Sequence, residues 1–243
     1  MKTEQDYQRV YAGINLDAVM HNLEKMRTLI KDDTKIIAVI KTDGYGHGAV
    51  PIAKKIESLP YLWGFAVATQ QEGTILRRHG LTKPILILGH SFEEEFERIV
   101  EDDLEPAIFT YESAKILSET AKRLKKTAKI HIKIDTGMSR IGFADVPESV
   151  ETIKKIAALP NVEIEGMFTH FARADETDRS PAITQLNRYL AFAELLEKAG
   201  VEIPMKHCSN SAGIIRVPEA NLNAVRAGIT IYGIYPSNEV ERD

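Results

Sequence analysis

The stretch IIAVIKTDGYGHG, residues 36–48, distinguishes between two common parallel α/β architectures. Its first five residues are all apolar, which is typical of a strand that is buried on both faces of a sheet. The turn that follows carries glycines at positions 44, 46 and 48, without the G-x-G-x-x-G spacing of a dinucleotide-binding turn. The stretch therefore predicts a buried parallel strand and argues against an open, doubly wound sheet that binds a dinucleotide.

The rest of the chain alternates short apolar runs with longer amphipathic stretches. Further strand-like runs cover residues 64–68, 85–88, 106–109, 130–134, 162–168, 205–208 and 222–225. Apolar residues at spacings of three and four predict helices over 17–30, 49–58, 70–79, 92–101, 111–126, 147–158 and 182–199. The first of these helices has a capped start at Asn15. Eight strands that alternate with helices predict parallel crossovers and an α/β fold, the (β/α)8 or TIM barrel.

The organisation of the chain is simple. A length of 243 residues suits one barrel of this kind, and the sequence contains no linker, low-complexity tract or internal repeat. We therefore predict a single domain over residues 1–243.

Composition excludes several classes of protein. The formal net charge is only −4, so we expect no nucleic-acid surface. No apolar run approaches the ~18 residues that span a membrane, and the polar start of the chain lacks the apolar core of a signal peptide. The single cysteine, Cys208, cannot form an internal disulfide, which favours a reducing compartment and a soluble, cytoplasmic protein. Cys208 is a weak candidate nucleophile because most single cysteines only pack.

Lys41 is the first candidate catalytic residue, because it directly follows the first apolar run. Barrels place their active sites at the carboxyl ends of the strands. A lysine there is partly desolvated, and a lowered pKa makes its amine able to form a Schiff base. Position alone fits a surface lysine at the start of a loop equally well.

The motif around Lys41 resembles the cofactor-lysine block of the alanine racemase family, whose usual form is K-A-N-A-Y-G-H-G. The match holds at Lys41 and over residues 45–48, and the sequence departs from that form at 42–44. Similar blocks occur along the chain in the family's order. GINLDAV (13–19) precedes Lys41, and KIDTGMSRIGF (133–143), THFA (169–172), NSA (210–212) and RAGITIYG (226–233) follow it. Six ordered blocks are far more specific than any one of them.

The resemblance implies a fold, a cofactor and a reaction. It implies an isomerase that uses pyridoxal 5'-phosphate to interconvert L- and D-alanine. The reaction would serve D-alanine biosynthesis, and D-alanine would be a precursor of peptidoglycan. Lys41 would hold the cofactor and exchange the α-proton of the amino acid on one face. No metal is expected.

The resemblance also assigns the other cofactor contacts. The phosphate would be bound by Tyr45, Asn210, Ser211 and the backbone of Gly228 and Ile229. Barrels commonly bind phosphate in the loops after strands seven and eight, and most of these residues lie there. The helix that begins at Asn210 and Ser211 would favour the dianion.

Four more residues receive roles from the resemblance. Arg226, expected at the end of the last strand, would face the pyridine nitrogen, and His170 would pack against the cofactor ring. Arg140 would contact the cofactor oxygen or the substrate carboxylate. Lys133 lies within a strand at a position that can be carbamylated, and the carbamate would orient Arg140.

Racemisation needs a base on each face of the α-carbon. In the family, the second base is a tyrosine of a C-terminal β domain, which the partner subunit of a homodimer contributes. We expect that domain to be absent from this chain, so that the chain is a truncated form without full activity. Tyr232 and Tyr235 are not at the position of the second base, and neither is assigned as catalytic.

Other functions stay open at this point. A serine racemase of the same fold would share these motifs. A single-barrel pyridoxal-phosphate-binding homeostasis protein has about this length, but its motif around the lysine differs. A lysine-dependent aldolase barrel is disfavoured by the blocks at Asn210-Ser211 and Arg226.

Overall fold

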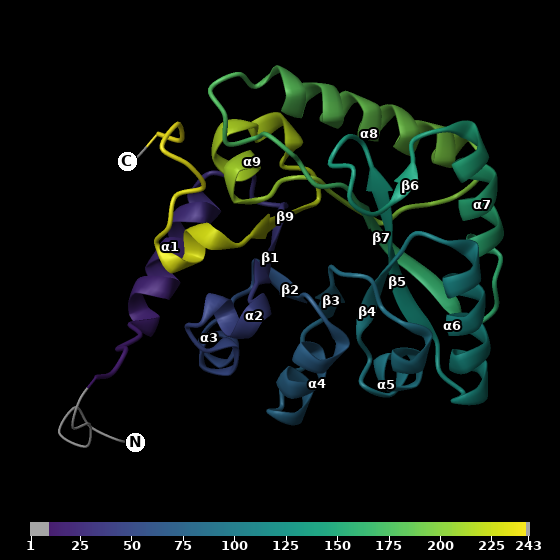
Figure 1. The fold of residues 1–243 in the computed structure, drawn as a ribbon, viewed down its shortest axis with the longest axis horizontal. Coiled ribbons are helices and arrows are strands. Elements are labelled where there is room, and N and C mark those ends of the chain that lie inside the picture. The colour runs from purple at the N-terminus through teal and green to yellow at the C-terminus, as the bar shows by residue number, and fades with distance from the viewer. Residues whose placement is uncertain (1–9, 242–243) are drawn as a thin grey trace.

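The computed structural model of the protein describes residues 10–241, whose strands form a nearly closed parallel barrel (Figure 1). The hydrogen-bonded order is β8-β7-β5-β4-β3-β2-β1-β9. These strands are β1 (Lys35–Val39), β2 (Leu62–Val67), β3 (Ile85–Ile87), β4 (Glu105–Ile108), β5 (Ala128–Asp135), β7 (Val162–Phe168), β8 (Met205–His207) and β9 (Ala224–Ala227). The predicted (β/α)8 barrel is therefore confirmed.

The barrel closes at a seam between β8 and β9. Two backbone hydrogen bonds cross it, from Asn223 N to Lys206 O at 3.1 Å and from Arg226 N to Ser209 O at 2.9 Å. The side chain of Asn223 also accepts from Lys206 N at 2.9 Å. A short strand, β6 (Phe143–Ala144), pairs with the end of β5 outside the barrel.

Helices surround the strands (Figure 1). Those that follow the predicted pattern are α1 (Leu16–Thr28), α3 (Ala49–Ile56), α4 (Gln70–Arg78), α5 (Phe96–Glu101), α6 (Tyr111–Arg123), α7 (Pro147–Ala157) and α8 (Ser180–Lys198). Shorter helices are α2 (Lys41–Tyr45), α9 (Ser211–Arg216), η2 (Glu93–Glu95), η3 (Pro218–Ala220) and η4 (Ile229–Tyr232). Within residues 10–241, no helix has both the length and the apolar character needed to cross a membrane.

Side-chain caps explain where several helices begin. The side chain of Asn15 accepts from Asp17 N at 2.9 Å and from Ala18 N at 3.1 Å, which confirms the predicted start of α1. Thr69 and Thr110 similarly cap α4 and α6. Each cap satisfies a backbone N–H group that has no partner within its helix.

The apolar side chains form two layers. The larger layer lies between the strands and the helices and includes Ile36, Ala38 and Ile40 of the first strand region. The smaller layer fills the barrel interior and includes Ile37 and Val39. Because successive residues of a strand point to opposite faces, both layers need apolar residues, and this produces the continuous apolar runs of the sequence.

Most predicted boundaries differ from the observed ones by one to three residues, and two of these differences have a structural reason. The last strand begins at Ala224 rather than at residue 222, because Leu222 and Asn223 form the turn at the seam, where Leu222 O accepts from the Thr34 hydroxyl at 2.8 Å. Arg226 therefore lies inside β9 and not at its end. The predicted helix over 92–101 divides into η2 and α5, and the Glu95 carboxylate accepts from Phe92 N at 2.9 Å at its start.

Candidate active site

A cavity of about 300 Å³ opens at the carboxyl ends of the strands. Its lining contains eight of the predicted site residues, which are Lys41, Tyr45, His170, Asn210, Ser211, Arg226, Gly228 and Ile229. Two other predicted residues lie outside the lining. Arg140 is in the exposed turn after β5, and Lys133 is buried inside the barrel.

Lys41 is placed by an unusual left-handed turn. The residues after it have positive φ angles, which are 54° at Thr42, 50° at Asp43 and 62° at Gly44. Such angles are costly for residues other than glycine, and strained backbone of this kind occurs often at functional sites. A Cβ at Gly44 would lie 3.2 Å from the side chain of Ile52 and 3.3 Å from Ala49 N, so the turn also packs tightly against α3.

Two carboxylates hold this turn in place. Glu72 accepts from Thr42 N at 2.8 Å and from Ala68 N at 2.7 Å, which ties the turn to the end of β2. Asp43 accepts from Ala49 N at 2.8 Å at the start of α3. Sequence reasoning missed Glu72, because its role depends on the backbone of a turn that is distant in sequence. The backbone strain at Lys41 is therefore compensated by charge-assisted hydrogen bonds.

The amine of Lys41 is prepared for nucleophilic chemistry. Burial, together with the positive charge of Arg140, lowers the pKa of Lys41 below its ordinary value. The Nζ atom lies 5.9 Å from the centre of the Tyr45 ring. A lowered pKa increases the fraction of neutral amine, which is the nucleophilic form.

Hydrogen-bond donors converge around Ser211. Its Oγ atom accepts from Gly228 N at 3.0 Å, from Thr230 N at 3.4 Å and from the Thr230 hydroxyl at 3.0 Å. Asn210 caps α9 by accepting from Gly213 N at 2.9 Å, so α9 does begin where the sequence predicted. Thr230 is a member of this cluster that sequence reasoning did not single out.

Arg226 is buried beneath the cavity, and its guanidinium group donates hydrogen bonds to backbone carbonyls and to a histidine ring. Its Nη2 atom donates to Thr169 O at 2.7 Å and to Cys208 O at 2.9 Å, and its Nη1 atom donates to His207 Nδ1 at 2.8 Å and to His207 O at 3.1 Å. Burial lowers the pKa of Arg226 to about 10, which leaves it charged at neutral pH. These contacts use both Nη atoms of Arg226, which also lines the cavity.

His170 and Lys133 lie beside this guanidinium. Burial and the positive charge of Arg226 lower the pKa of His170 to about 3, so its ring is neutral. The same two causes lower the pKa of Lys133 to about 8. The Lys133 amine donates to Ile134 O at 2.7 Å and lies 5.5 Å from the centre of the Phe168 ring.

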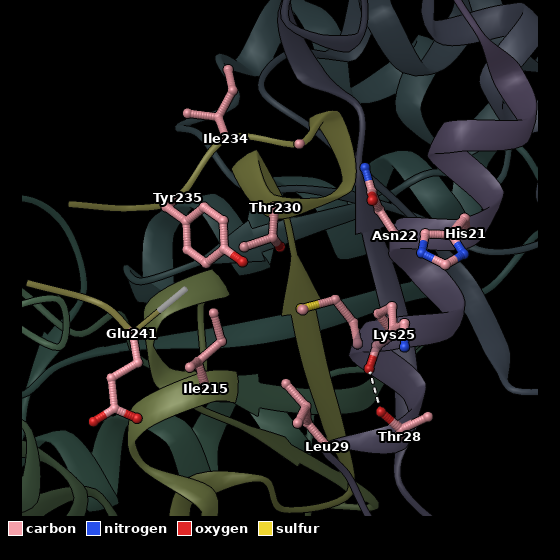
Figure 2. Close-up of a pocket in the computed structure, with 12 residues that line it drawn as sticks. His21, Asn22, Lys25, Thr28, Leu29, Ile215, Thr230, Ile234, Tyr235 and Glu241 are labelled. Atoms are coloured by element: carbon pink, nitrogen blue, oxygen red, sulfur yellow. Dashed lines mark hydrogen bonds between the residues drawn. The ribbon is translucent and has the colours of Figure 1, made fainter. Parts of the chain in front are cut away.

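Three other candidates have different surroundings. Cys208 is fully buried, and burial raises the pKa of its thiol, which disfavours a nucleophilic role. The Tyr232 hydroxyl donates to Val39 O at 2.9 Å, and burial raises its pKa. Tyr235 lines a separate cavity of about 350 Å³ between α1 and the C-terminal segment. Figure 2 shows Asn22 and Tyr235 on opposite sides of it.

Comparison with known proteins gives this cavity a family context. Residues 14–236 match the family described as alanine racemase, N-terminal domain. The chain belongs to this family. Alanine racemase from Methanococcus maripaludis is 43% identical over 234 residues, which cover 96% of this chain and 62% of the relative.

Solved structures of alanine racemases have the same fold. One from Clostridium difficile has a TM-score of 0.92 and 44% identity, over 94% of this chain and 60% of that protein. One from Bacillus anthracis, with bound L-Ala-P, has a TM-score of 0.87 and 35% identity, over 96% of this chain and 61% of that protein. The chain thus spans about three fifths of the length of the alanine racemases that it matches.

Proposed function

We propose that this chain is the cofactor-binding barrel of a pyridoxal-phosphate-dependent racemase that interconverts L- and D-alanine. The observation that carries the proposal is the convergence of Lys41, the donor cluster at Ser211 and Arg226 on one cavity. The alanine racemases among the relatives support the choice of substrate.

The donor cluster fits a phosphate group. Two backbone N–H groups and two hydroxyls, from Gly228, Thr230 and Ser211, lie within hydrogen-bonding distance of one another. A Cβ at Gly228 would lie 3.6 Å from the Tyr45 hydroxyl, so a third hydroxyl faces the same corner. Neutral and backbone donors of this kind are a common setting for phosphate in barrels. We propose that Asn210 contributes by fixing the start of α9, and Ile229 by its backbone.

Lys41 is proposed as the catalytic residue. Bound pyridoxal phosphate supplies an electron sink for the electron pair that the α-proton leaves behind. The Lys41 amine, with its lowered pKa, would link to the cofactor with loss of water. Once the amine of the substrate had displaced it from the cofactor, the freed Nζ would take up or return the α-proton on one face of the substrate. The left-handed turn at Thr42 to Tyr45 holds this amine at the cavity wall.

Arg226 and His170 are proposed to set the electronic surroundings. A guanidinium donates a hydrogen bond but does not give up its proton, so Arg226 would leave a ring nitrogen unprotonated. This limits electron withdrawal and favours simple proton exchange over side reactions. The neutral His170 ring would contact the cofactor face. Arg140, whose charge already acts on Lys41, would contact a substrate carboxylate, and Lys133 is proposed as a carbamylation site.

We propose that residues 1–243 form one domain, that the protein acts in the cytoplasm as a homodimer, and that its product serves peptidoglycan synthesis. The second base is assigned to none of residues 10–241. In particular, the Tyr232 hydroxyl is used by Val39 O.

Borohydride reduction with excess pyridoxal phosphate, followed by peptide mapping, tests the proposal. We expect the reduced cofactor on Lys41 alone, and none on a Lys41→Ala variant. Lys133 is the informative comparison, because the pKa of its buried amine is also lowered, to about 8. Label on Lys133 or on surface lysines, with none on Lys41, would contradict the assignment.

A further inference from the structure

A file of four buried polar side chains runs through the barrel interior. Arg226 Nη1 lies 2.8 Å from His207 Nδ1, His207 Nε2 lies 3.0 Å from His131 Nδ1, and His131 Nε2 lies 3.0 Å from Glu105 Oε2. The four residues come from β9, β8, β5 and β4. The file therefore connects the cavity at one end of the barrel with the first residue of β4 at the other end.

The chemistry of Arg226 fixes the direction of every hydrogen bond in this file. A guanidinium can only donate, so His207 Nδ1 must accept and its proton must be on Nε2. That Nε2–H then donates to His131 Nδ1, which leaves the His131 proton on Nε2, where it donates to the Glu105 carboxylate. The reverse arrangement would leave His207 with no ring proton at all. Burial and the charge of Arg226 also hold the pKa of His207 well below its ordinary value, in agreement with a neutral ring.

The barrel interior contains few charged side chains, and Glu105 is one of them. Among residues 10–241, Glu105 is the one buried acidic residue, and the buried lysine and arginine are Lys133 and Arg226. A buried charge is costly unless it is compensated. Within the part of the chain that the structure describes, the hydrogen bonds of Arg226 go to carbonyls and imidazoles, so its link to the Glu105 carboxylate runs through the two rings.

The packing around the rings is adapted to this file. A Cβ at position 166 would lie 2.7 Å from His131 Nδ1 and 2.8 Å from Met205 O, so only glycine leaves room for the His131 ring. The His207 ring stacks on Phe168, with centroids 5.0 Å apart and planes inclined by 10°. Trp63 contacts the His131 ring edge-on at 5.5 Å. These neighbours hold both rings in the orientation that the hydrogen bonds require.

We propose that Glu105 is a positioning residue, which accepts the Nε2–H proton of His131 and so holds the two rings, and through them the Arg226 guanidinium, in the orientation that the hydrogen bonds require. The file is a property of the protein alone. Its effect on the cofactor rests on the function proposed above, through the contact of Arg226 with the ring nitrogen.

The environment of Glu105 offers a matched control. A cavity of about 280 Å³ at the amino-terminal end of the barrel is lined by Glu105 and also by Glu163, which is exposed. Replacing Glu163 removes the same charge from the same cavity, at a residue outside the file. A general effect of charge at this end would therefore appear in both variants.

The test is the protonation state of the ring nitrogens, read from nitrogen NMR of histidine-labelled chain without cofactor. We expect the Nε2–H form for both His131 and His207 in the wild type. Glu105→Gln keeps an acceptor oxygen and should preserve both forms. Glu105→Leu leaves the Nε2–H of His131 without an acceptor, so the nitrogen resonance of that N–H group should shift although the ring keeps the Nε2–H form, whereas Glu163→Leu should match the wild type.

Cofactor affinity provides the second measurement. We expect pyridoxal phosphate to bind Glu105→Leu roughly tenfold more weakly than wild type, because the support of Arg226 is lost, and to bind Glu163→Leu as wild type does. A proton on Nδ1 of either ring in the wild type would overturn the proposal, whether or not any variant folds. So would equal effects of the Glu105→Leu and Glu163→Leu changes. If both rings had the expected Nε2–H form but the wild-type chain did not bind pyridoxal phosphate, the proposed function would be refuted. The proposal about the file would not be affected.

Discussion

Replacement of Glu72 by alanine tests how the strained turn after Lys41 is maintained. The Glu72 carboxylate accepts two backbone hydrogen bonds, of 2.8 and 2.7 Å, from Thr42 and Ala68. Hydrogen bonds to a charged group contribute about 1.5–3 kcal/mol each when they are buried. Glu72 is half-buried, so water replaces part of this contribution, and we expect a loss of about 2–3 kcal/mol in the free energy of unfolding.

The expected loss is comparable with the strain that it opposes. A residue other than glycine in the left-handed region costs about 1–2 kcal/mol. Thr42 and Asp43 both adopt such angles. Without Glu72 the turn can relax, and the Lys41 amine would leave the cavity wall. We therefore expect the Glu72→Ala variant to be both less stable and slower to link to pyridoxal phosphate.

Urea unfolding followed by the fluorescence of Trp63, the one tryptophan of the chain, measures the stability, and borohydride trapping measures the reactivity of Lys41. Glu97→Ala is a suitable control, because Glu97 forms an exposed ion pair with Arg123, and such pairs contribute little to stability. The reasoning would be refuted if the two variants had the same stability and the same trapping rate.

Three further substitutions test other parts of the molecule. Ser211→Ala removes the centre of the donor cluster. It should weaken the binding of pyridoxal phosphate roughly 10- to 100-fold, which corresponds to the usual strength of a charge-assisted hydrogen bond. Unchanged affinity in a titration would contradict the proposed phosphate site. Lys133→Met should flatten the pH dependence of stability. Because the pKa of Lys133 is about 8 when folded and 10.5 ordinarily, the folded chain binds fewer protons between these values, and its stability should rise with pH there by about 3 kcal/mol. An equal rise in the variant, by urea unfolding at about pH 7.5 and 10, would exclude this effect. Gly166→Ala should cost about 1–3 kcal/mol of stability because its Cβ would lie 2.7 Å from His131 Nδ1, and a wild-type unfolding midpoint would show that the ring can move.

Most of the fold could be predicted from the sequence because parallel barrel strands are buried on both faces. The apolar runs at 36–40 and 64–68 therefore coincide with β1 and β2. The last strand was misplaced by two residues, since Leu222 is apolar but belongs to the turn at the seam. A hydropathy pattern does not record which carbonyl accepts the hydroxyl of Thr34, and that contact helps to define the turn.

The candidate site was predictable to a smaller extent. Chain position and motif were sufficient to bring Lys41, Ser211 and Arg226 to one cavity. Glu72 and Glu105 were missed, because one holds a backbone turn and the other ends a file of side chains from four strands. Their sequence neighbourhoods are those of ordinary helix and strand residues, and their roles arise only when distant elements are packed together.

The pairing of β1 with β9 has a consequence for the order of events during folding. Lys35 pairs with Ala224, so this contact joins segments from opposite ends of the chain, and contacts of such high sequence separation form slowly. Lys41 follows the first of these strands, whereas Arg226 lies in the last and Gly228 directly follows it. A nascent chain that lacks β9 therefore has Lys41 but neither the buried arginine nor the backbone donors of Gly228 and Thr230. Under the proposed function, capture of the cofactor would therefore report that β1 and β9 have paired.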